Sequence, residues 1–170
     1  MQRNRGVTLV ELVTTLAVVA LLATLAAPSF RELGRRAAVL SATHAVMSAL
    51  HTTRSASITR GRPGILCLTA SDNACLTNTA RVATGYLAWI DAGTQRGQFD
   101  ASDTLLMRAS LPGDIAIRGS RTYVTFWPVA RAGTTNTLSI CDLALLAAPA
   151  QVVVSQSGRQ LADRGHSVLE

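Results

Sequence analysis

The longest apolar segment of the chain lies close to its N-terminus. Residues Val7 to Ala27 form a run of 21 residues that contains one charged side chain, Glu11, and four threonines. About 20 residues of α-helix, rising about 1.5 Å each, cross a hydrocarbon layer about 30 Å thick. The run therefore predicts a membrane-spanning helix, preceded by a short leader that holds Arg3 and Arg5.

A cleaved secretory signal peptide is the alternative interpretation of this segment. Such peptides also begin with basic residues, but their apolar part covers only about 7–15 residues and ends at a small-residue cleavage site. The residues from Ala20 to Ala27 could imitate such a site. The length of the run and the early Glu11 favour a helix that is retained.

A helical pattern resumes after Pro28. Apolar positions recur about every 3.6 residues and form one stripe, which comprises Val39, Leu40, Ala42, Thr43, Val46, Met47, Leu50, Arg54 and Ile58. Gly61 and Pro63 end the pattern, because proline cannot continue a helix and glycine suits a C-terminal cap. We expect one long helix over residues 7–60, bent or loosened at Pro28, with the stripe packed on a sheet.

Short β-like segments separated by turn residues follow the helix. The predicted strands are 65–69, 86–91, 104–110, 115–118, 123–128, 138–142 and 151–155. Consecutive short strands without intervening helices favour an antiparallel sheet. The expected fold class is α+β: one long N-terminal helix, its first half transmembrane, packed on a C-terminal antiparallel β-sheet. The expected parts are a leader (1–6), a span (7–27), an amphipathic helical half (28–60) and a β-rich domain (61–170).

Composition narrows the possible functions. The chain is 48% hydrophobic and carries a formal charge of +6, so it can bury a core and is not disordered. Its basic residues are all arginine, which suits phosphate contacts, although a GC-rich genome produces the same bias. His44 and His51 are expected at the surface or at the helix–sheet contact, because their spacing is not that of a metal site. No nucleophile–base pattern is present, so neither an enzyme nor a cofactor is expected.

Three cysteines, Cys67, Cys75 and Cys141, leave one unpaired if a disulfide forms. A Cys67–Cys75 bridge would close a short loop, whereas Cys67–Cys141 would join two strands. We favour the first pairing, and the second stays open. The cysteines include no close pair of the zinc-finger type, so no metal centre is predicted. The aspartates of residues 91–103 lack the spacing of a calcium loop, so an ordinary polar loop is expected there.

Glu11 is the residue of the apolar run that points to function. A carboxylate inside an apolar span is energetically costly and marks a functional site by default. It lies one helical turn after Val7, so a free amine at Val7, in the same chain or in a neighbouring one, could pair with it. The alternative is that Glu11 only reaches the headgroup region.

The N-terminal segment reads RGVTLVELVTTLAVVALLATLAAPSF. It resembles the N-terminal segment of type IV pilins and type II secretion pseudopilins through Gly6, Thr8, Leu9, Glu11, Leu12 and Pro28. Val7 stands where phenylalanine is usual. The resemblance implies that a prepilin peptidase cuts after Gly6, that the new N-terminal Val7 is methylated, and that Glu11 and Pro28 serve assembly.

Later segments resemble one branch of this class, the GspH/FimT family of minor pilins and minor pseudopilins. In chain order they are GRPGILCLTASDNACL, GYLAWIDAG, LLMRASLP, YVTFWPVARAG, LSICD and VVVSQSGR. Ala130 stands where the family often has glycine, and Gly158-Arg159 lacks the second arginine of the family's Gly-Arg-x-Arg ending. The resemblance implies a pilin fold.

The function implied is that of a minor pilin that primes or joins type IV pilus assembly. The alternative is a minor pseudopilin of a type II secretion system. The implied partners are other pilins or pseudopilins, the prepilin peptidase and the inner-membrane assembly platform. Charges flanking the span do not decide its orientation. An inner-membrane protein with a cytoplasmic N-terminus and a periplasmic domain is expected from the resemblance and from cysteines that an oxidising periplasm could join.

DNA capture is a further expectation. In DNA-binding members of the family the C-terminal Gly-Arg region contributes to binding, which by resemblance points to Arg159. Several arginines fall near predicted strand ends and turns, namely Arg118, Arg121, Arg131, Arg159 and Arg164. Such a site would hold double-stranded DNA through its phosphates, without sequence specificity. A solvated basic surface is the alternative.

Overall fold

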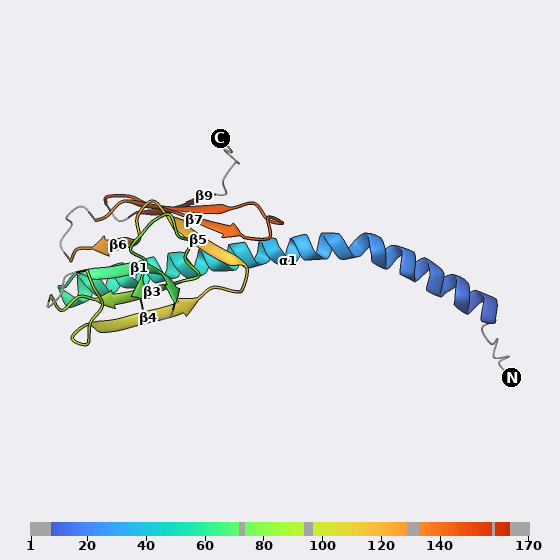
Figure 1. Cartoon of the computed structure of the whole chain (residues 1–170), viewed down its shortest axis with the longest axis horizontal. Helices are drawn as coiled ribbons and strands as arrows, with labels where there is room; N and C mark the ends of the chain where they lie inside the picture. Colours follow the sequence, from blue (N-terminus) through green and yellow to red (C-terminus); the bar gives the residue numbers. More distant parts are fainter. Residues whose placement is uncertain (1–7, 72–73, 94–96, 129–132, 158, 164–170) are drawn as a thin grey trace. The chain divides into compact units, whose positions relative to one another are not determined.

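The computed structural model describes residues 8–71, 74–93, 97–128, 133–157 and 159–163, without the side chains of residues 25–28, 71 and 163 (Figure 1). The chain divides into two compact units, Met1–Gly34 and Arg35–Glu170. One helix, α1 (Leu9–Arg60), begins in the first unit and ends in the second. The predicted single long helix is therefore confirmed, and its backbone stays helical through Pro28.

Local hydrogen bonds set both ends of α1. Thr8 precedes the first helical residue, and its Oγ1 accepts a hydrogen bond of 3.3 Å from the backbone N–H of Glu11, as an N-cap does. At the other end Gly61 has a φ of 65°, and the N–H of Arg62 donates to the carbonyl of Ser57 at 3.3 Å. This bond across a left-handed glycine is a Schellman motif. The predicted helix end at Gly61 is confirmed.

Nine strands follow within the described residues, and seven of them overlap predicted strands. They are β1 (Gly64–Ser71), β2 (Ala74–Cys75), β3 (Gly85–Ile90), β4 (Thr104–Ser110), β5 (Ile115–Gly119), β6 (Tyr123–Phe126), β7 (Asn136–Asp142), β8 (Ala150–Val154) and β9 (Gln160–Asp163). The sequence did not predict β2 and β9. Both are short and lie at sheet edges, where little burial is needed and no alternating pattern marks the strand.

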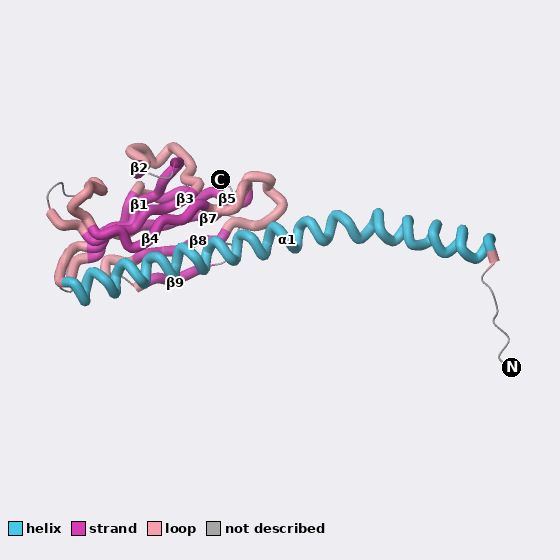
Figure 2. The backbone as a smooth tube through the Cα atoms, turned by 90° about the horizontal axis from the view of Figure 1, so that it is seen from below, coloured by secondary structure: helices cyan, strands magenta, loops and turns pink. Residues whose placement is uncertain are grey.

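The strands form two antiparallel sheets, whereas the sequence predicted one. In the first sheet β1 pairs with β3, which pairs with β4, while β6 and β2 pair with different parts of the other edge of β1. The second sheet has the order β5-β7-β8-β9. A bridge between Ala83 and Ile117 links the two sheets. Figure 2 shows the second half of α1 running alongside the strands.

The second half of α1 buries one stripe against the sheets. Its buried residues are Val39, Ala42, Thr43, Val46, Ala49, Leu50, Thr53 and Ser57. The predicted stripe is wrong at Leu40 and Ile58, whose side chains are exposed. Ile58 follows Ser57 by one residue, a rotation of about 100° around the helix. A small hydroxyl therefore faces the core where the sequence predicted an isoleucine.

Small residues are needed there because β1 approaches α1 very closely. A Cβ added to Gly64 would lie 2.7 Å from the carbonyl oxygen of Thr53 and 3.1 Å from the Cβ of Ser57. Thr53 Oγ1 donates to a helix carbonyl one turn earlier at 2.7 Å. Ser57 Oγ lies 2.8 Å from the carbonyl of Arg62 and 2.9 Å from that of Phe126, and donates to one at a time. The buried hydroxyls thus keep their hydrogen bonds.

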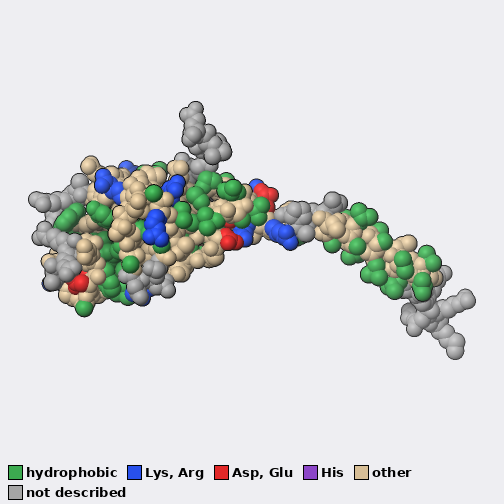
Figure 3. All heavy atoms as spheres, viewed as in Figure 1, with side chains coloured by type: hydrophobic (Ala, Val, Ile, Leu, Met, Phe, Trp, Pro, Cys, Tyr) green, Lys and Arg blue, Asp and Glu red, His purple; other side chains and the backbone are tan. Residues whose placement is uncertain are grey.

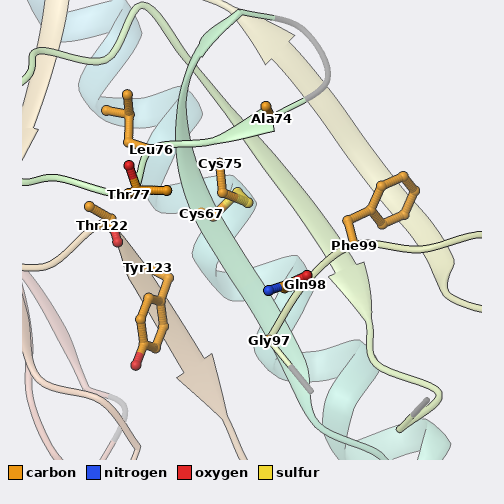
Figure 4. Close-up of a pocket in the computed structure, with 10 residues that line it drawn as sticks. All are labelled: Cys67, Ala74, Cys75, Leu76, Thr77, Gly97, Gln98, Phe99, Thr122 and Tyr123. Atoms are coloured by element: carbon orange, nitrogen blue, oxygen red, sulfur yellow. A yellow bond between two sulfur atoms is a disulfide. The ribbon is translucent and has the colours of Figure 1, made fainter. Parts of the chain in front are cut away.

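The outer face of the first sheet has a small core of its own. Its buried members are Ile65, Cys67, Leu87 and Trp89. The ring of Phe99, from the β3–β4 loop, packs edge-on against Trp89 with 5.7 Å between the ring centres. Cys67 and Cys75 form a disulfide with their Cα atoms 5.6 Å apart, which ties β2 to β1 (Figure 4).

The favoured cysteine pairing is therefore confirmed, and the alternative pairing of Cys67 with Cys141 is wrong. Cys141 lies in β7 of the second sheet and keeps a free thiol. A hollow of about 420 Å³ opens beside the disulfide, between β2, residues 97–99 and the start of β6 (Figure 4). The disulfide forms part of its wall.

Breaking this disulfide should destabilise the folded domain. The chain-entropy model gives about 2–3 kcal/mol for a bridge of this short span. We expect Cys75→Ser to lower the free energy of unfolding by that amount in a denaturant titration of the full-length protein in detergent. Cys141→Ser is the matched control, because its thiol is not bridged. Equal destabilisation by the two variants would contradict the assignment.

Carboxylates organise the loop between β3 and β4. Asp91 is buried and accepts hydrogen bonds from the N–H groups of Gly93 at 2.6 Å and Gly97 at 3.2 Å. Asp103 accepts two more backbone N–H groups of the same loop. In the part of the chain that the structure describes, no three His, Cys, Asp or Glu side chains form a group that could hold a metal ion. These carboxylates bind the loop's own backbone.

Candidate functional site

In the first unit, the described part of α1 is covered with exposed apolar side chains. They are Leu9, Val10, Leu12, Val13, Leu16, Val18, Val19, Leu21, Leu22, Phe30 and Leu33. The helix is long and apolar enough to cross a membrane, and its most apolar stretch has no part buried inside the structure. A helix that is apolar on all sides must be covered by lipid or by other protein.

The threonines of this half are compatible with an apolar environment. Thr14, Thr15 and Thr24 each donate their hydroxyl to the helix carbonyl three residues earlier, at 3.0, 2.9 and 2.8 Å. Because an unsatisfied polar group is costly in hydrocarbon, these bonds lower the cost of placing threonine there. The carboxylate of Glu11 remains as the one formal charge of the apolar run.

Glu11 lies in the first turn of α1, exposed at the helix surface. Unpaired N–H groups and the helix dipole favour a carboxylate at this end. Thr8 and Glu11 also have the Ser/Thr-x-x-Glu spacing of a capping box, a sequence signal that sequence reasoning missed and that accounts for the helix start. Glu11 therefore has two possible roles, in starting the helix and in presenting a charge to a neighbour.

The other predicted residues of this segment are described only in part. Gly6 and Val7, the predicted processing residues, lie outside the described residues, as does the side chain of Pro28. Their roles in cleavage, methylation and assembly stay predictions.

The second sheet brings together two of the predicted arginines. Arg121 follows β5, Arg159 precedes β9, and both are exposed. They lie at the same end of the sheet. The side chain of Asn136 accepts a hydrogen bond from the N–H of Arg121, and Asn136 is paired through β8 with Gln160, the residue after Arg159. Two strand spacings, about 10 Å in all, separate Asn136 from Gln160.

The remaining arginines are placed differently. Arg118 lies within β5, and its guanidinium donates to the carbonyl of Ala80 at 3.2 Å. Arg131 and Arg164 lie outside the described residues. Arg54, predicted as part of the helix stripe, instead donates to the carbonyl of Ser157 at 3.0 Å and so ties α1 to the β8–β9 turn that carries Arg159. Its helical spacing gave no sign of this contact.

The face of the molecule drawn in Figure 3 carries its basic side chains in separate spots. There they lie among apolar and neutral polar groups and do not merge into one patch. A polyanion on such a face would contact few arginines at a time. On this face the distribution supports modest, salt-dependent binding.

The free thiol of Cys141 is poorly suited to chemistry. It is half-buried, and burial raises the pKa of the thiol, an effect that the nearby charge of Arg118 partly opposes. Because the thiolate is the reactive form, Cys141 is expected to react slowly at neutral pH.

Two family models match the sequence. The one described as the prokaryotic N-terminal methylation motif matches residues 1–27. The one described as type II transport protein GspH matches residues 42–158, more than half of the chain. Comparison with curated proteins found none that matches.

The fold is similar to that of the type IV minor pilin FimU of Pseudomonas aeruginosa strain PAO1, solved in two crystal forms. The first has a TM-score of 0.56 at 15% sequence identity and covers 77% of this chain and 92% of FimU. The second has a TM-score of 0.52 at 16% identity and covers 73% and 91%. The predicted pilin fold is confirmed. Since the GspH model spans most of the second unit and the methylation motif covers the apolar helix, the chain belongs to the GspH family of minor pilins and pseudopilins.

Proposed function

We propose that this protein is a minor pilin that enters a type IV pilus at low copy and helps to start its assembly. The observation that carries the proposal is the exposed apolar half of α1 with a single carboxylate in its first turn. The family and the fold are those of structural filament proteins, which are not enzymes. The methylation motif implies interaction with other pilins and with the prepilin peptidase.

Two environments can cover the apolar half of α1 in turn. Lipid covers it in the inner membrane, and the helices of neighbouring subunits cover it in a filament. Leucine and valine are equally well buried in lipid and in a filament core, so their burial favours neither environment. Glu11 must therefore be the residue that favours the filament. In a protein-filled core a carboxylate needs an opposite charge close by, and cleavage after Gly6 would supply one as the new amine of Val7.

The proposed orientation has the N-terminus in the cytoplasm and the second unit in the periplasm. The Cys67–Cys75 disulfide supports it, because disulfides persist in the periplasm and are rare in the cytosol. The inner-membrane assembly platform would then meet the cytoplasmic end of α1.

A minor pseudopilin of a type II secretion system is the second candidate, favoured by the description of the matching family model. Deletion of the gene separates the two. The pilus proposal expects loss of surface pili with normal protein secretion, and the tagged protein should be found in sheared pili. Normal piliation with a loss of secretion would instead support the pseudopilin.

We also propose that the sheet end carrying Arg121 and Arg159 contacts DNA phosphates. Two such contacts imply a slope of roughly −2 when the logarithm of the binding constant is plotted against that of the salt concentration. Base sequence should not matter, because phosphate contacts carry no sequence information directly.

Arg159→Gln should weaken duplex DNA binding and make the salt slope shallower by about one unit. The measurement is a titration of the full-length protein in detergent at several salt concentrations. Arg108→Gln, which removes an exposed arginine from β4 of the other sheet, is the matched control and should leave the slope unchanged. Absence of binding at low salt, or equal slopes for the parent and Arg159→Gln, would rule out DNA capture by Arg159.

A further inference from the structure

Apolar side chains gather on the turn between β7 and β8, which we term the leucine turn (residues 143–146). Leu143, Leu145 and Leu146 are all exposed there, and Leu145 has 88% of its surface open. Single exposed leucines are ordinary on protein surfaces. Three on one turn make an apolar tip, which is the kind of surface that contacts a partner or a membrane.

The fold holds this tip outward. The buried carboxylate of Asp142 accepts hydrogen bonds from the N–H groups of Ala144 and Leu146, each at 3.1 Å, and its backbone carbonyl accepts the N–H of Leu145 at 3.1 Å. Leu145 has a φ of 57°, the one positive value of a residue other than glycine in the described part of the chain. This conformation is unfavourable for leucine, and because Leu145 is exposed, no burial within the unit compensates for it.

The leucine turn lies where the chain enters the second unit. Arg35, the first residue of that unit, forms ion pairs with Asp114 at 2.5 Å and with Asp142 at 3.8 Å. The N–H of Leu143 donates to the carbonyl of Asp114 at 2.8 Å. Arg35 also offsets one of the two negative charges of these carboxylates, which lowers the repulsion that an anionic lipid surface would exert.

Chain length limits how far this entrance can be from the membrane. Arg35 follows Ala27, the end of the predicted span, by eight residues, which is about 12 Å of helix. The headgroup layer extends about 5–8 Å beyond the hydrocarbon. This upper limit on the distance between Arg35 and the hydrocarbon layer depends only on the number of connecting residues, so it holds for any angle between the two units.

We propose that the leucine turn docks on the lipid headgroup layer of the membrane in which the first half of α1 is anchored, before the subunit enters a filament. The proposal rests on the membrane-anchored state proposed above. The three leucines would bury their apolar surface at the level of the headgroups, as the apolar side of interfacial segments does. This contact would hold the second unit against the bilayer until assembly removes the subunit from it.

Fluorescence quenching in vesicles tests the docking. Full-length protein is reconstituted in phosphatidylethanolamine–phosphatidylglycerol vesicles, with or without bromine on the lipid chains. The bromine lies near the headgroups for Leu145→Trp and Leu161→Trp, and near the chain ends for Leu16→Trp, because Leu16 lies in the middle of the predicted span. The reporter is Leu145→Trp, the matched control is Leu161→Trp, an exposed leucine in β9, and Leu16→Trp reports on the apolar half of α1. Each is compared with the parent chain, and thermal unfolding in detergent checks that every variant is folded.

We expect brominated lipid to quench the fluorescence added by Leu145→Trp about twofold more than that added by Leu161→Trp. Equal quenching of these two, with Leu16→Trp strongly quenched, would overturn the docking and leave the membrane anchor intact. Unquenched Leu16→Trp would contradict the membrane-anchored state itself. Protection of Leu145→Trp from both brominated lipid and aqueous iodide would show that protein, such as a second copy, covers the turn, and would also overturn the proposal.

Discussion

Replacing Glu11 with glutamine should leave membrane insertion and leader cleavage intact and reduce incorporation into filaments by about tenfold or more, the scale expected when one partner of a buried charge pair is removed. Glutamine keeps the size and hydrogen-bonding capacity that the capping-box position uses, but it lacks the charge that would pair with the amine of Val7. The measurement compares the tagged variant in sheared filaments with the same variant in the membrane fraction.

Two further variants separate the roles of Glu11. Glu11→Ala, which also removes the capping group, should incorporate as poorly as Glu11→Gln. Thr14→Ala is the matched control, because Thr14 lies one turn further along the same apolar helix and bonds only within it. It should incorporate normally. If Glu11→Gln enters filaments as well as the parent while Glu11→Ala does not, the residue serves only helix capping and the proposed charge pairing is wrong.

Leu50→Ala should lower the free energy of unfolding by about 2–5 kcal/mol, because it leaves a cavity in the core between α1 and the sheets. Leu50 is fully buried, whereas Ile58, two turns later on the same predicted stripe, is 57% exposed. Ile58→Ala should therefore change the stability by no more than about 0.5 kcal/mol. Denaturant titration of the full-length variants in detergent measures both.

This pair tests the orientation of α1 on the sheets. The sequence pattern alone predicts a similar loss for both residues, since both belong to the apolar stripe. A large loss for Ile58→Ala, or a negligible one for Leu50→Ala, would contradict the packing described here.

Local signals were enough to predict much of this fold. Gly61 fixes the end of α1 through its left-handed backbone. The capping spacing of Thr8 and Glu11 at the helix start is also a local signal, although it was missed in the sequence. Longer strands such as β7 alternate between buried and half-buried residues along their length, and this alternation is visible in the sequence. The Cys67–Cys75 pairing was one of two that the sequence left open.

Non-local contacts account for what the sequence could not show. The division into two sheets depends on β6 returning to pair with β1, a choice between strands of similar pattern. Ser57, rather than Ile58, faces the core because Gly64 lets β1 lie close to the helix. Five candidate arginines were likewise identified from the sequence, but their positions relative to one another could not be predicted from it. Only the register of the second sheet places Arg121 and Arg159 at one end, and only the fold brings Arg54 to a turn 103 residues away.

Intact-mass analysis of the protein extracted from membranes tests the pilin assignment most directly. The cleavage site lies outside the described residues, so the chemistry must be measured. We expect a chain that begins at Val7, lacks the six leader residues and carries one additional methyl group on its N-terminal amine. A chain that still begins at Met1, or one cleaved near Ala26, would contradict the account.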